Sequence, residues 1–362
     1  MSTPSTTETL FGQLDRMGHE QVMHFNDPHT GLRGIIALHD TTLGPALGGT
    51  RIWRYTDEAA ALRDVLRLSR GMTYKSAITG IELGGGKAVI IDHDGAQHET
   101  EAFWRSYGRF VNNLGGKYIT AEDVGTKPLY MEYIAKETRF VTGKPAWLGG
   151  GGDPSPVTAY GVYLGMKAAW KHRTGREDLG GVRVMVQGAG NVGRFLIDHL
   201  SDENAHVLVA DIDADNLRRA TADHDVTIVD PDGVYDADVD IYAPCALGAT
   251  LNDDTIPRLK CSVVAGAANN QLAVESVHGS ALRDRDIVYA PDFLINAGGV
   301  VNCFAEVHGY DRDRAMAGTE AIYDRTLEVL VRARDTDANP QDVAGRIAEE
   351  RIEAVARLKA RL

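Results

Sequence analysis

The sequence predicts an α/β protein with two domains separated by a cleft, and three observations lead to this fold class. Residues 1–145 mix strand and helix patterns, a segment rich in glycine and proline follows, and residues 146–330 alternate strands with helices around a glycine motif. A chain of 362 residues is long enough to form two hydrophobic cores. The helical residues 331–362 are expected to pack back on the first domain.

In the first domain, short apolar runs predict strands at residues 34–38 and 88–91. Between them, residues 57–69 form a predicted helix, because acids occupy the first turn and Leu62, Val65 and Leu66 share one face. These elements predict a mixed α/β domain.

The segment 147–156 contains four consecutive glycines at 149–152 and two prolines, which is typical of an interdomain hinge or a cleft edge. Ser155 is predicted to N-cap the next helix. Strands at 239–242, 261–265 and 287–289 run into small or polar residues, and such carboxyl ends are where open α/β sheets bind ligands.

A glycine fingerprint lies between a predicted strand at 182–186 and a helix, and it reads Gly188-Ala189-Gly190-Asn191-Val192-Gly193. The first glycine allows the tight turn, the second lets the backbone approach a pyrophosphate, and the third lets helix and strand pack closely. A second strand at 206–210 ends at Asp211, a carboxylate placed to bind ribose hydroxyls. The region therefore predicts a dinucleotide site.

NAD is predicted over NADP. Asp211 is followed by Asp213 and Asp215, and no arginine lies between Asp211 and Arg218, so the acidic cluster would repel a 2′-phosphate.

Composition excludes several classes of partner. The formal net charge of −13 argues against nucleic acid and anionic membranes. No apolar run approaches the roughly 20 residues that span a bilayer, and residues 1–9 lack the apolar core of a signal peptide. The three scattered cysteines predict neither disulfides nor a metal site. We therefore expect a cytoplasmic protein without a bound metal.

Two lysines stand in glycine-bearing contexts ahead of the fingerprint, Lys75 in Gly71-Met72-Thr73-Tyr74-Lys75 and Lys87 in Gly84-Gly85-Gly86-Lys87. Amines in a closed site, together with a cofactor fold, indicate a dehydrogenase that handles a carboxylate-bearing substrate.

Six blocks in order resemble the glutamate, leucine, phenylalanine and valine dehydrogenase superfamily, nearest to its leucine dehydrogenases. The resemblance covers nearly the whole chain. The blocks are Gly44-Pro45-Ala46-Leu47-Gly48-Gly49-Thr50-Arg51, Ala121-Glu122-Asp123-Val124-Gly125-Thr126, Asp153-Pro154-Ser155-Pro156-Val157-Thr158-Ala159-Tyr160-Gly161, Ala243-Pro244-Cys245-Ala246, Ala268-Asn269-Asn270-Gln271 and Ile295-Asn296-Ala297-Gly298-Gly299-Val300.

The resemblance implies reversible oxidative deamination of an L-amino acid to a 2-oxo acid and ammonia. Lys87 matches the family's catalytic lysine, Asp123 its catalytic aspartate and Lys75 its carboxylate-binding lysine. A lysine acts as a base at neutral pH only where its surroundings favour the neutral amine. The further residues implied in substrate binding are Gly48, Gly49, Met72 and Asn270, and those implied at the cofactor are Thr158, Ala243, Cys245 and Asn296.

The positions matching the family's side-chain pocket are uncharged, namely Leu47, Ala121, Val300 and Cys303. Glutamate-specific members carry a lysine where this chain has Leu47, and a buried carboxylate without a partner would cost several kcal/mol. Leucine, valine and isoleucine are therefore the expected substrates. Cys303 departs from the valine usual in leucine dehydrogenases, and we expect it to line the pocket.

Three alternatives remain. Aromatic-specific members such as phenylalanine dehydrogenases usually differ just before the aspartate. A non-catalytic NAD-responsive module would keep the fingerprint without the acid/base residues, yet Lys75, Lys87 and Asp123 are all present. A hydroxy-acid dehydrogenase would use a histidine with a carboxylate partner, and no histidine here lies in such a motif. Members of the family are oligomers, so a homo-oligomer between dimer and octamer is expected.

Overall fold

The computed structural model describes residues 9–360, so residues 1–8 and 361–362 lie outside the described part of the chain. It is a mixed α/β structure with two sheets in two compact units, which confirms the predicted fold class. The first unit takes the chain up to Gly152, Glu306–Tyr310 and the part from Ile352. The second takes Asp153–Ala305 and Asp311–Arg351.

The units divide the chain differently from the predicted boundary at residue 145. One physical reason is Glu306, whose carboxylate is 1% exposed and accepts hydrogen bonds from the backbone N–H groups of Gly143 (2.9 Å), Lys144 (3.4 Å) and Gly151 (3.1 Å). These contacts hold the glycine-rich segment within the first unit. Of the terminal helices, residues 331–351 belong to the second unit, whereas the prediction placed all of 331–362 on the first.

The first unit contains a five-stranded sheet in the order β1-β2-β4-β3-β5, in which β1, β2 and β4 are antiparallel neighbours and β3 runs parallel to β4 and β5. Its strands are β1 (Gln21–Asp27), β2 (Leu32–Asp40), β3 (Ala46–Trp53), β4 (Gly84–Ile91) and β5 (Tyr118–Glu122). Its helices are α1 (Leu10–Met17), α2 (Glu58–Thr79), α3 (Glu101–Asn112) and α4 (Pro128–Ala135).

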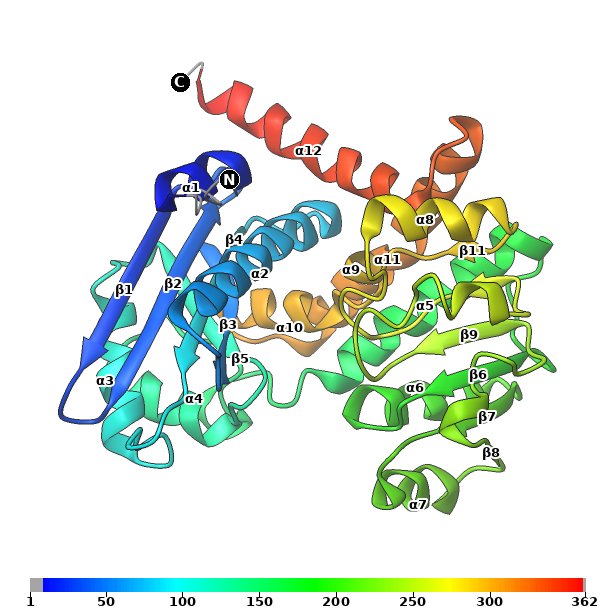
Figure 1. Ribbon diagram of the computed structural model, residues 1–362, viewed down its shortest axis with the longest axis horizontal. Coiled ribbons are helices and arrows are strands. Elements are labelled where there is room, and N and C mark those ends of the chain that lie inside the picture. Colours follow the sequence, from blue (N-terminus) through cyan, green and yellow to red (C-terminus); the bar gives the residue numbers. More distant parts are fainter. Residues whose placement is uncertain (1–8, 361–362) are drawn as a thin grey trace, which may run out of the picture. The chain divides into compact units, whose positions relative to one another are not determined.

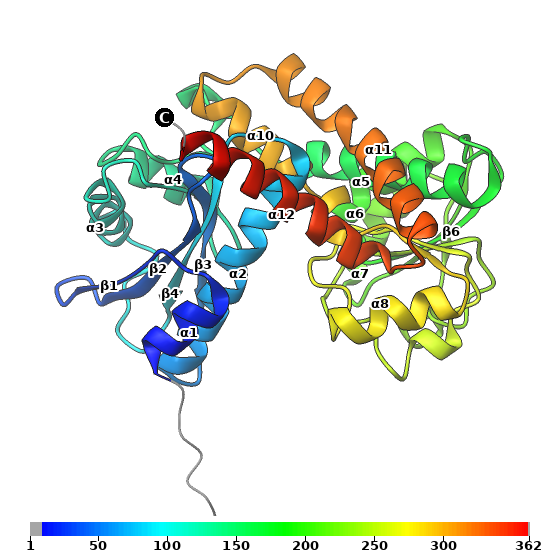
Figure 2. The ribbon, with the colours of Figure 1, turned by 90° about the horizontal axis from the view of Figure 1, so that it is seen from above.

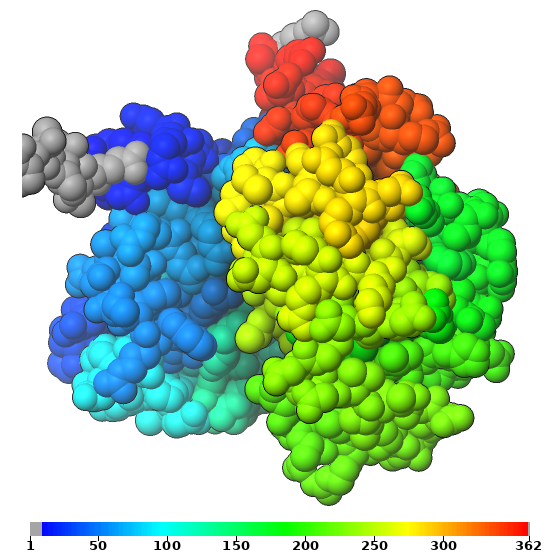
Figure 3. Space-filling model, turned by 45° about the vertical axis from the view of Figure 1, so that its right-hand side comes forward, coloured from blue at the N-terminus to red at the C-terminus, as the bar shows by residue number. Residues whose placement is uncertain are grey.

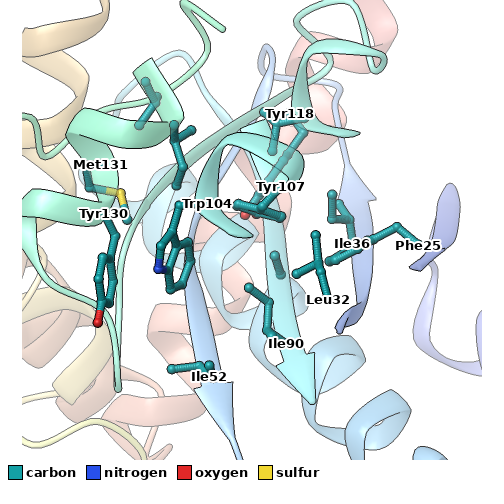
Figure 4. Close-up of a cluster of buried hydrophobic side chains, with 14 of the residues drawn as sticks. Phe25, Leu32, Ile36, Ile52, Ile90, Trp104, Tyr107, Tyr118, Tyr130 and Met131 are labelled. Atoms are coloured by element: carbon teal, nitrogen blue, oxygen red, sulfur yellow. The ribbon is translucent and has the colours of Figure 1, made fainter. Parts of the chain in front are cut away.

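Helices cover both faces of this sheet (Figures 1 and 2). On one face, Val65 and Leu66 of α2 pack against Ile35, Ala37 and Val89 of the sheet. On the other face, α3 and α4 close a larger aromatic core, in which Trp104 and Tyr130 stack with ring centroids 4.4 Å apart (Figure 4). The sheet therefore has a separate apolar layer on each side.

Helix α2 continues to Thr79, well beyond its predicted end at Ser69. It begins after Asp57, whose side chain accepts a hydrogen bond from the Ala60 N–H, and it ends at Gly80 with φ 75°. The predicted helix covered only the stretch with the apolar face of Leu62, Val65 and Leu66, and Gly71, which follows it, has a low helix propensity. Tertiary packing overrides that preference, and the helix continues through Gly71 to carry Met72 and Lys75.

Strand β4 begins at Gly84, four residues before the predicted start, so the glycine run belongs to the strand. A Cβ at Gly85 would lie 2.1 Å from the backbone nitrogen of Thr73. Only glycine therefore allows α2 to pack this closely on β4.

The second unit contains a six-stranded parallel sheet in the order β11-β10-β9-β6-β7-β8. Its strands are β6 (Arg183–Gln187), β7 (His206–Ala210), β8 (Thr227–Ile228), β9 (Ile241–Pro244), β10 (Val263–Val264) and β11 (Val288–Tyr289). The chain moves outward from β6 to β8 and then returns to β9 on the other side of β6. The switch point of this doubly wound sheet thus lies between β6 and β9.

The helices of this unit are α5 (Ser155–Thr174), α6 (Asn191–Asp202), α7 (Ala214–Ala222), α8 (Glu275–Asp284), α9 (Asp292–Ile295) and α11 (Arg312–Asp335), while α10 (Gly298–Val307) and α12 (Pro340–Lys359) continue into the first unit. Helix α8 lies at the surface (Figure 3), and its buried residues are His278, Gly279 and Leu282. Ser155 does not cap α5 as predicted. It is the first helical residue, and its N–H donates to Asp153 Oδ1 (2.9 Å).

Among residues 9–360, no helix combines the length and apolar character that crossing a membrane requires.

Candidate active site

Lys87 and Asp123 form a buried ion pair in the first unit. The Lys87 side chain is 6% exposed, and its Nζ lies 2.9 Å from Asp123 Oδ2. Lys87 pairs in register with Ala37, which packs on the α2 side, so strand alternation places the lysine on the α2 face of the sheet. An amine and a carboxylate are thereby held together away from bulk water.

Asp123 lies just beyond β5 in a tightly closed turn. Its N–H donates to the Thr126 hydroxyl (2.8 Å), and that hydroxyl donates to the Asp123 carbonyl (2.8 Å). Gly125 adopts φ 80°, a left-handed conformation that favours glycine. The short motif therefore fixes the backbone from which the carboxylate projects.

Arg51 is a second cation at this carboxylate, and the sequence analysis assigned it no role. Its Nε donates to Asp123 Oδ2 at 3.0 Å. Burial by itself would raise the pKa of Asp123, but the charges of Lys87 and Arg51 outweigh burial and hold that pKa below its usual value. Strand periodicity was an available signal, because Arg51 lies two residues after Gly49 and so points to the same face.

The arginine is itself held by Asp64 of α2. Arg51 Nη1 contacts Asp64 Oδ2 at 3.1 Å, and Asp64 also accepts hydrogen bonds from the Tyr55 hydroxyl (2.7 Å) and from Arg67 Nη2 (3.0 Å). Burial raises the pKa of Asp64, yet the Tyr55 hydroxyl and the two arginines lower it overall. Both carboxylates are therefore ionised at neutral pH.

The predicted pocket residues of the first unit lie beside this pair. Leu47 and Ala121 are buried on β3 and β5. Ala121 follows Thr120, whose hydroxyl lies on the opposite, α3 side of the sheet at 3.3 Å from the Tyr107 hydroxyl, so Ala121 faces α2. Their apolar surfaces therefore border the buried charges.

Two glycines and two α2 residues complete this set. A Cβ at Gly49 would lie 2.1 Å from the Glu122 carbonyl oxygen, and one at Gly48 would lie 3.4 Å from Met72 Cγ. The Tyr118 hydroxyl donates to the Gly48 carbonyl (2.6 Å). Lys75 is partly buried on α2. A Cβ at Gly48 would also lie 1.8 Å from the Gly86 carbonyl oxygen, so the backbone of β4 and β5 leaves no room for larger side chains at the two glycines.

In the second unit, the fingerprint has the geometry of a phosphate-binding turn. Gly188 adopts φ 103°, and a Cβ at Gly193 would lie 2.0 Å from the Gly188 carbonyl oxygen. Gly190 is the N-cap of α6, and a Cβ there would have no neighbour within 4 Å. Packing within the described structure therefore does not require a glycine at 190, and space is left open at the N-terminus of α6. The intervening Ala189 is buried, Asn191 is exposed and Val192 is partly buried.

Asp211 bridges this turn from the end of β7. Its Oδ2 accepts hydrogen bonds from the Ala189 N–H (2.7 Å) and from Asn216 Nδ2 (3.1 Å), and its Oδ1 accepts one from the Asp213 N–H (2.8 Å). The carboxylate is thus oriented by the glycine turn itself. Arg218, the first arginine after it, is paired with Asp215.

The other predicted cofactor residues lie near the carboxyl ends of the central strands. Asn296 is 5% exposed, and its Nδ2 donates to the Ala267 carbonyl (3.0 Å) and to Asn269 Oδ1 (2.8 Å). Its Oδ1 is buried and has no hydrogen-bond partner in the described structure. A buried amide oxygen without a donor costs free energy, so this atom is available to accept a hydrogen bond from a ligand.

Thr158, Ala243 and Cys245 have local partners. The Thr158 hydroxyl donates to the Pro154 carbonyl (2.9 Å), Ala243 is buried in β9, and the Cys245 N–H donates to the Gln187 carbonyl (2.7 Å). Burial raises the pKa of the Cys245 thiol to about 12, so the thiol is protonated at neutral pH and lacks nucleophilic character.

The remaining predicted substrate residues also belong to the second unit. Asn270 is exposed and adopts φ 53°, a left-handed conformation that is uncommon outside glycine and asparagine. Val300 and Cys303 are buried and lie three residues apart on α10, so they share one helix face. The predicted residues therefore fall into two sets. Lys75, Lys87, Asp123, Leu47 and Ala121 lie in the first unit, and the fingerprint, Asn270, Asn296, Val300 and Cys303 in the second.

Within the described part of the chain, no group of three or more histidine, cysteine, aspartate or glutamate side chains is arranged to hold a metal ion. Cys245, Cys261 and Cys303 are free cysteines.

Comparison with known proteins relates both units to one family. Residues 19–140 match the family model described as "Glu/Leu/Phe/Val dehydrogenase, dimerisation domain". Residues 149–215 and 213–332 match the model described as "Glutamate/Leucine/Phenylalanine/Valine dehydrogenase".

Individual relatives extend over nearly the full length. The chain is 51% identical to a leucine dehydrogenase of Bacillus subtilis over 352 residues, which covers 96% of this chain and 95% of the relative. It is 49% identical to a valine dehydrogenase of Streptomyces coelicolor, with 95% and 94% covered. The crystal structure of L-tryptophan dehydrogenase from Nostoc punctiforme superimposes with a TM-score of 0.84 at 44% identity, covering 96% of this chain and all of that one.

Proposed function

Because the chain belongs to the glutamate/leucine/phenylalanine/valine dehydrogenase family and is an amino-acid dehydrogenase with a dinucleotide cofactor, we propose that it oxidises aliphatic L-amino acids with NAD. Leucine, valine and isoleucine are the proposed substrates. The products are the 2-oxo acid, ammonia and NADH, and the reaction is reversible.

The observation that carries this proposal is the buried pair of Lys87 and Asp123, 2.9 Å apart. Deamination needs one group that accepts a proton from the substrate ammonium and another that activates water. Both cations at Asp123 contact Oδ2, and no hydrogen bond to Oδ1 is found among the described residues. Asp123 Oδ1 is therefore the proposed acceptor of the ammonium proton.

The proposed sequence of steps uses both groups. Lys75 binds the substrate carboxylate, and Asp123 takes one proton from the α-ammonium group. NAD bound at the fingerprint of the second unit would supply the hydride acceptor, and loss of a hydride from Cα would convert the substrate amine into an iminium. Neutral Lys87 then removes a proton from the water that attacks this carbon, and Asp123 returns its proton to the departing nitrogen. The C–N bond of the carbinolamine then breaks, its hydroxyl proton passes to solvent, and the 2-oxo acid and ammonia are released.

The second unit supports NAD as the cofactor. Gly190 leaves open space at the N-terminus of α6 for a pyrophosphate, Asp211 presents a carboxylate for ribose hydroxyls, and Asn296 Oδ1 offers an acceptor to a carboxamide. Arg218 is engaged with Asp215, which supports the preference for NAD over NADP.

The pocket residues support an aliphatic substrate. Leu47 and Ala121 are buried and uncharged, so a substrate carboxylate would lose its hydration there without gaining a partner, at a cost of several kcal/mol. A methylene group changes binding by only about 1–3 kcal/mol, so the three branched-chain amino acids are all expected to react.

An aromatic substrate is the second candidate, and the likeness to a tryptophan dehydrogenase over nearly the whole chain favours it. The relative turnover of aliphatic and aromatic amino acids decides between the two candidates.

The test is NADH formation by the purified protein with NAD and each L-amino acid in turn, with Lys87→Ala as the control. Turnover of leucine, valine and isoleucine that disappears in the variant is the expected result. Preference for phenylalanine or tryptophan would replace the aliphatic assignment. Binding of NAD without turnover of any amino acid would indicate a non-catalytic module and overturn the proposal.

A further inference from the structure

Resting on this proposed function, we propose that Arg51, held in place by Asp64, is a positioning residue that keeps Asp123 ionised while Lys87 is neutral, so that Asp123 can accept the proton of the substrate ammonium. Asp123 contacts two cations of different chemistry, and only one of them exchanges protons in the proposed reaction.

The contacts form a chain of alternating charge across four segments of the first unit. Lys87 of β4 contacts Asp123, Asp123 contacts Arg51 of β3, and Arg51 contacts Asp64 of α2. Arg67 and Tyr55 complete the chain at Asp64. The Lys87 side chain at one end is 6% exposed, Asp123, Arg51 and Asp64 are 23%, 22% and 17% exposed, and Arg67 at the other end is 51% exposed. The chain therefore runs from a buried amine outward to solvent.

The two cations on Asp123 are not equivalent. Lys87 must be neutral before it can act as a base, and in that state Asp123 would be a carboxylate buried without a counter-charge from Lys87. Such a carboxylate takes up a proton readily, which would remove the acceptor for the substrate ammonium. A guanidinium stays protonated at any pH that the protein experiences, so Arg51 supplies a constant charge at 3.0 Å.

Arg51 also determines which carboxylate oxygen is available. Its Nε and Lys87 Nζ both contact Oδ2, so the carboxylate plane is held from two sides and Oδ1 is directed elsewhere. Burial lowers the pKa of Arg51, but Asp123 and Asp64 outweigh burial and raise it. The groups that face Asp123 are Lys87 from β4 and Arg51 from β3, and Asp64, Tyr55 and Arg67 act through the arginine.

The first experiment measures kcat/KM for leucine against pH in the wild type, Arg51→Gln and Arg51→Lys. Without the guanidinium, Lys87 is the one described cation left on Asp123, so both groups hold their protons more tightly. We expect the pH of half-maximal kcat/KM to rise by about one unit in Arg51→Gln. Arg51→Lys keeps a positive charge at this position, so its pH of half-maximal kcat/KM should lie close to that of the wild type.

Arg54→Gln is the matched control, because it removes one positive charge from an exposed pair with Asp94 only three residues along the chain. Its profile should coincide with that of the wild type. If Arg51→Gln instead lowers activity equally at every pH, Arg51 has a merely structural role and the proposal is wrong.

The sign of the shift in Asp64→Asn tests how Asp64 acts. If the lost charge of Asp64 acts only through space, its removal lowers the pKa values of the nearby groups, and the pH of half-maximal kcat/KM falls. Release of Arg51 from its anchor moves it upward, which is the expected result. The double variant Arg51→Gln/Asp64→Asn should then show no upward shift beyond that of Arg51→Gln. A downward shift in Asp64→Asn would contradict the positioning role of Asp64.

A readout that needs no turnover separates this proposal from the proposed function. The Asp123 carboxyl carbon is titrated by carbon-13 NMR, with its resonance assigned by its absence in Asp123→Asn. The pKa of Asp123 should rise in Arg51→Gln by about one unit and stay unchanged in Arg54→Gln. If no amino acid is oxidised but this rise is seen, the proposed function fails and the electrostatic role of Arg51 stands. If the pKa of Asp123 does not move, the inference is wrong whatever the substrate.

Discussion

The proposed sites in the two units depend on different parts of the chain, namely side chains in the first unit and backbone in the second. The first unit relies on charged side chains, since Lys87, Asp123, Arg51 and Asp64 come from four segments and neutralise one another. The second unit relies on the backbone, since Gly188, Gly190 and Gly193 shape one turn within six residues. A side-chain site can lose a charge and keep its fold, whereas a backbone site changes shape when a side chain is added at a position such as Gly193, where a Cβ would lie 2.0 Å from the Gly188 carbonyl oxygen.

The largest effect is expected for Lys87→Ala, which breaks the side-chain site alone. Loss of an acid/base group lowers kcat by about 10²–10⁴-fold. Affinity for NAD should be unchanged, because the fingerprint lies in the other unit. Steady-state kinetics and a fluorescence titration with NAD measure the two quantities. Loss of NAD affinity together with kcat would show that the two sites are not independent.

A pH effect on stability is expected next, from a second side-chain cluster of the first unit. His19 Nε2 lies 3.1 Å from the Leu66 carbonyl and 2.8 Å from the Ser69 hydroxyl, and its ring packs edge-on against His39 at 4.8 Å. Burial, the neighbouring His39 and Arg70 lower the pKa of His19 to about 4.

The sign follows from proton uptake. Between its ordinary pKa of 6.5 and about 4, His19 is protonated in the unfolded chain and neutral in the folded one. The free energy of unfolding should therefore fall by up to about 3 kcal/mol as the pH falls through this range. Urea denaturation at several pH values measures it. His19→Gln should show a weaker pH dependence, and an unchanged dependence would contradict the assignment to His19.

Gly193→Ala tests the backbone site. The added Cβ would lie 2.0 Å from the Gly188 carbonyl oxygen, so the turn or α6 must shift. We expect a loss of about 1–3 kcal/mol in unfolding free energy and weaker NAD binding. Thermal denaturation and NAD titration measure both effects. Gly190→Ala is the matched control, because its Cβ meets no protein atom and should weaken NAD binding with little loss of stability.

The smallest effect is expected for Asp211→Ala, which removes the one charged side chain that the backbone site uses. Its hydrogen bond with the Ala189 N–H is lost, as is the proposed contact with ribose. NAD affinity should fall about tenfold, while NADP affinity falls less. Calorimetric titration with each nucleotide measures the difference. An equal loss for both nucleotides would remove the support for NAD specificity.

Local pattern was sufficient for much of the fold. The strand at 206–210 was predicted at its observed bounds, and the helix after the fingerprint was also anticipated. The predicted end of the helix at 57–69 was wrong, because Gly71 lowers helix propensity but α2 gains more from packing on β4. The predicted N-cap of α5 was wrong by one residue. Pro154 occupies the N-cap position, Ser155 is already helical, and its N–H donates to the Asp153 side chain.

The same contrast applies to the site residues. The sequence alone determined the two-domain α/β class and the glycine turn followed by Asp211. It also determined the family of the chain, and with it the positions of Lys87 and Asp123 as matches to the family's motifs. Each of these depends on residues close together in the chain or on a recognisable motif. Only the tertiary structure decided that Arg51 and Lys87 share one oxygen of Asp123 and that Asp64 anchors the arginine. A charge pair depends on distance in space, and strands β3, β4 and β5 become neighbours through sheet pairing that no local pattern specifies.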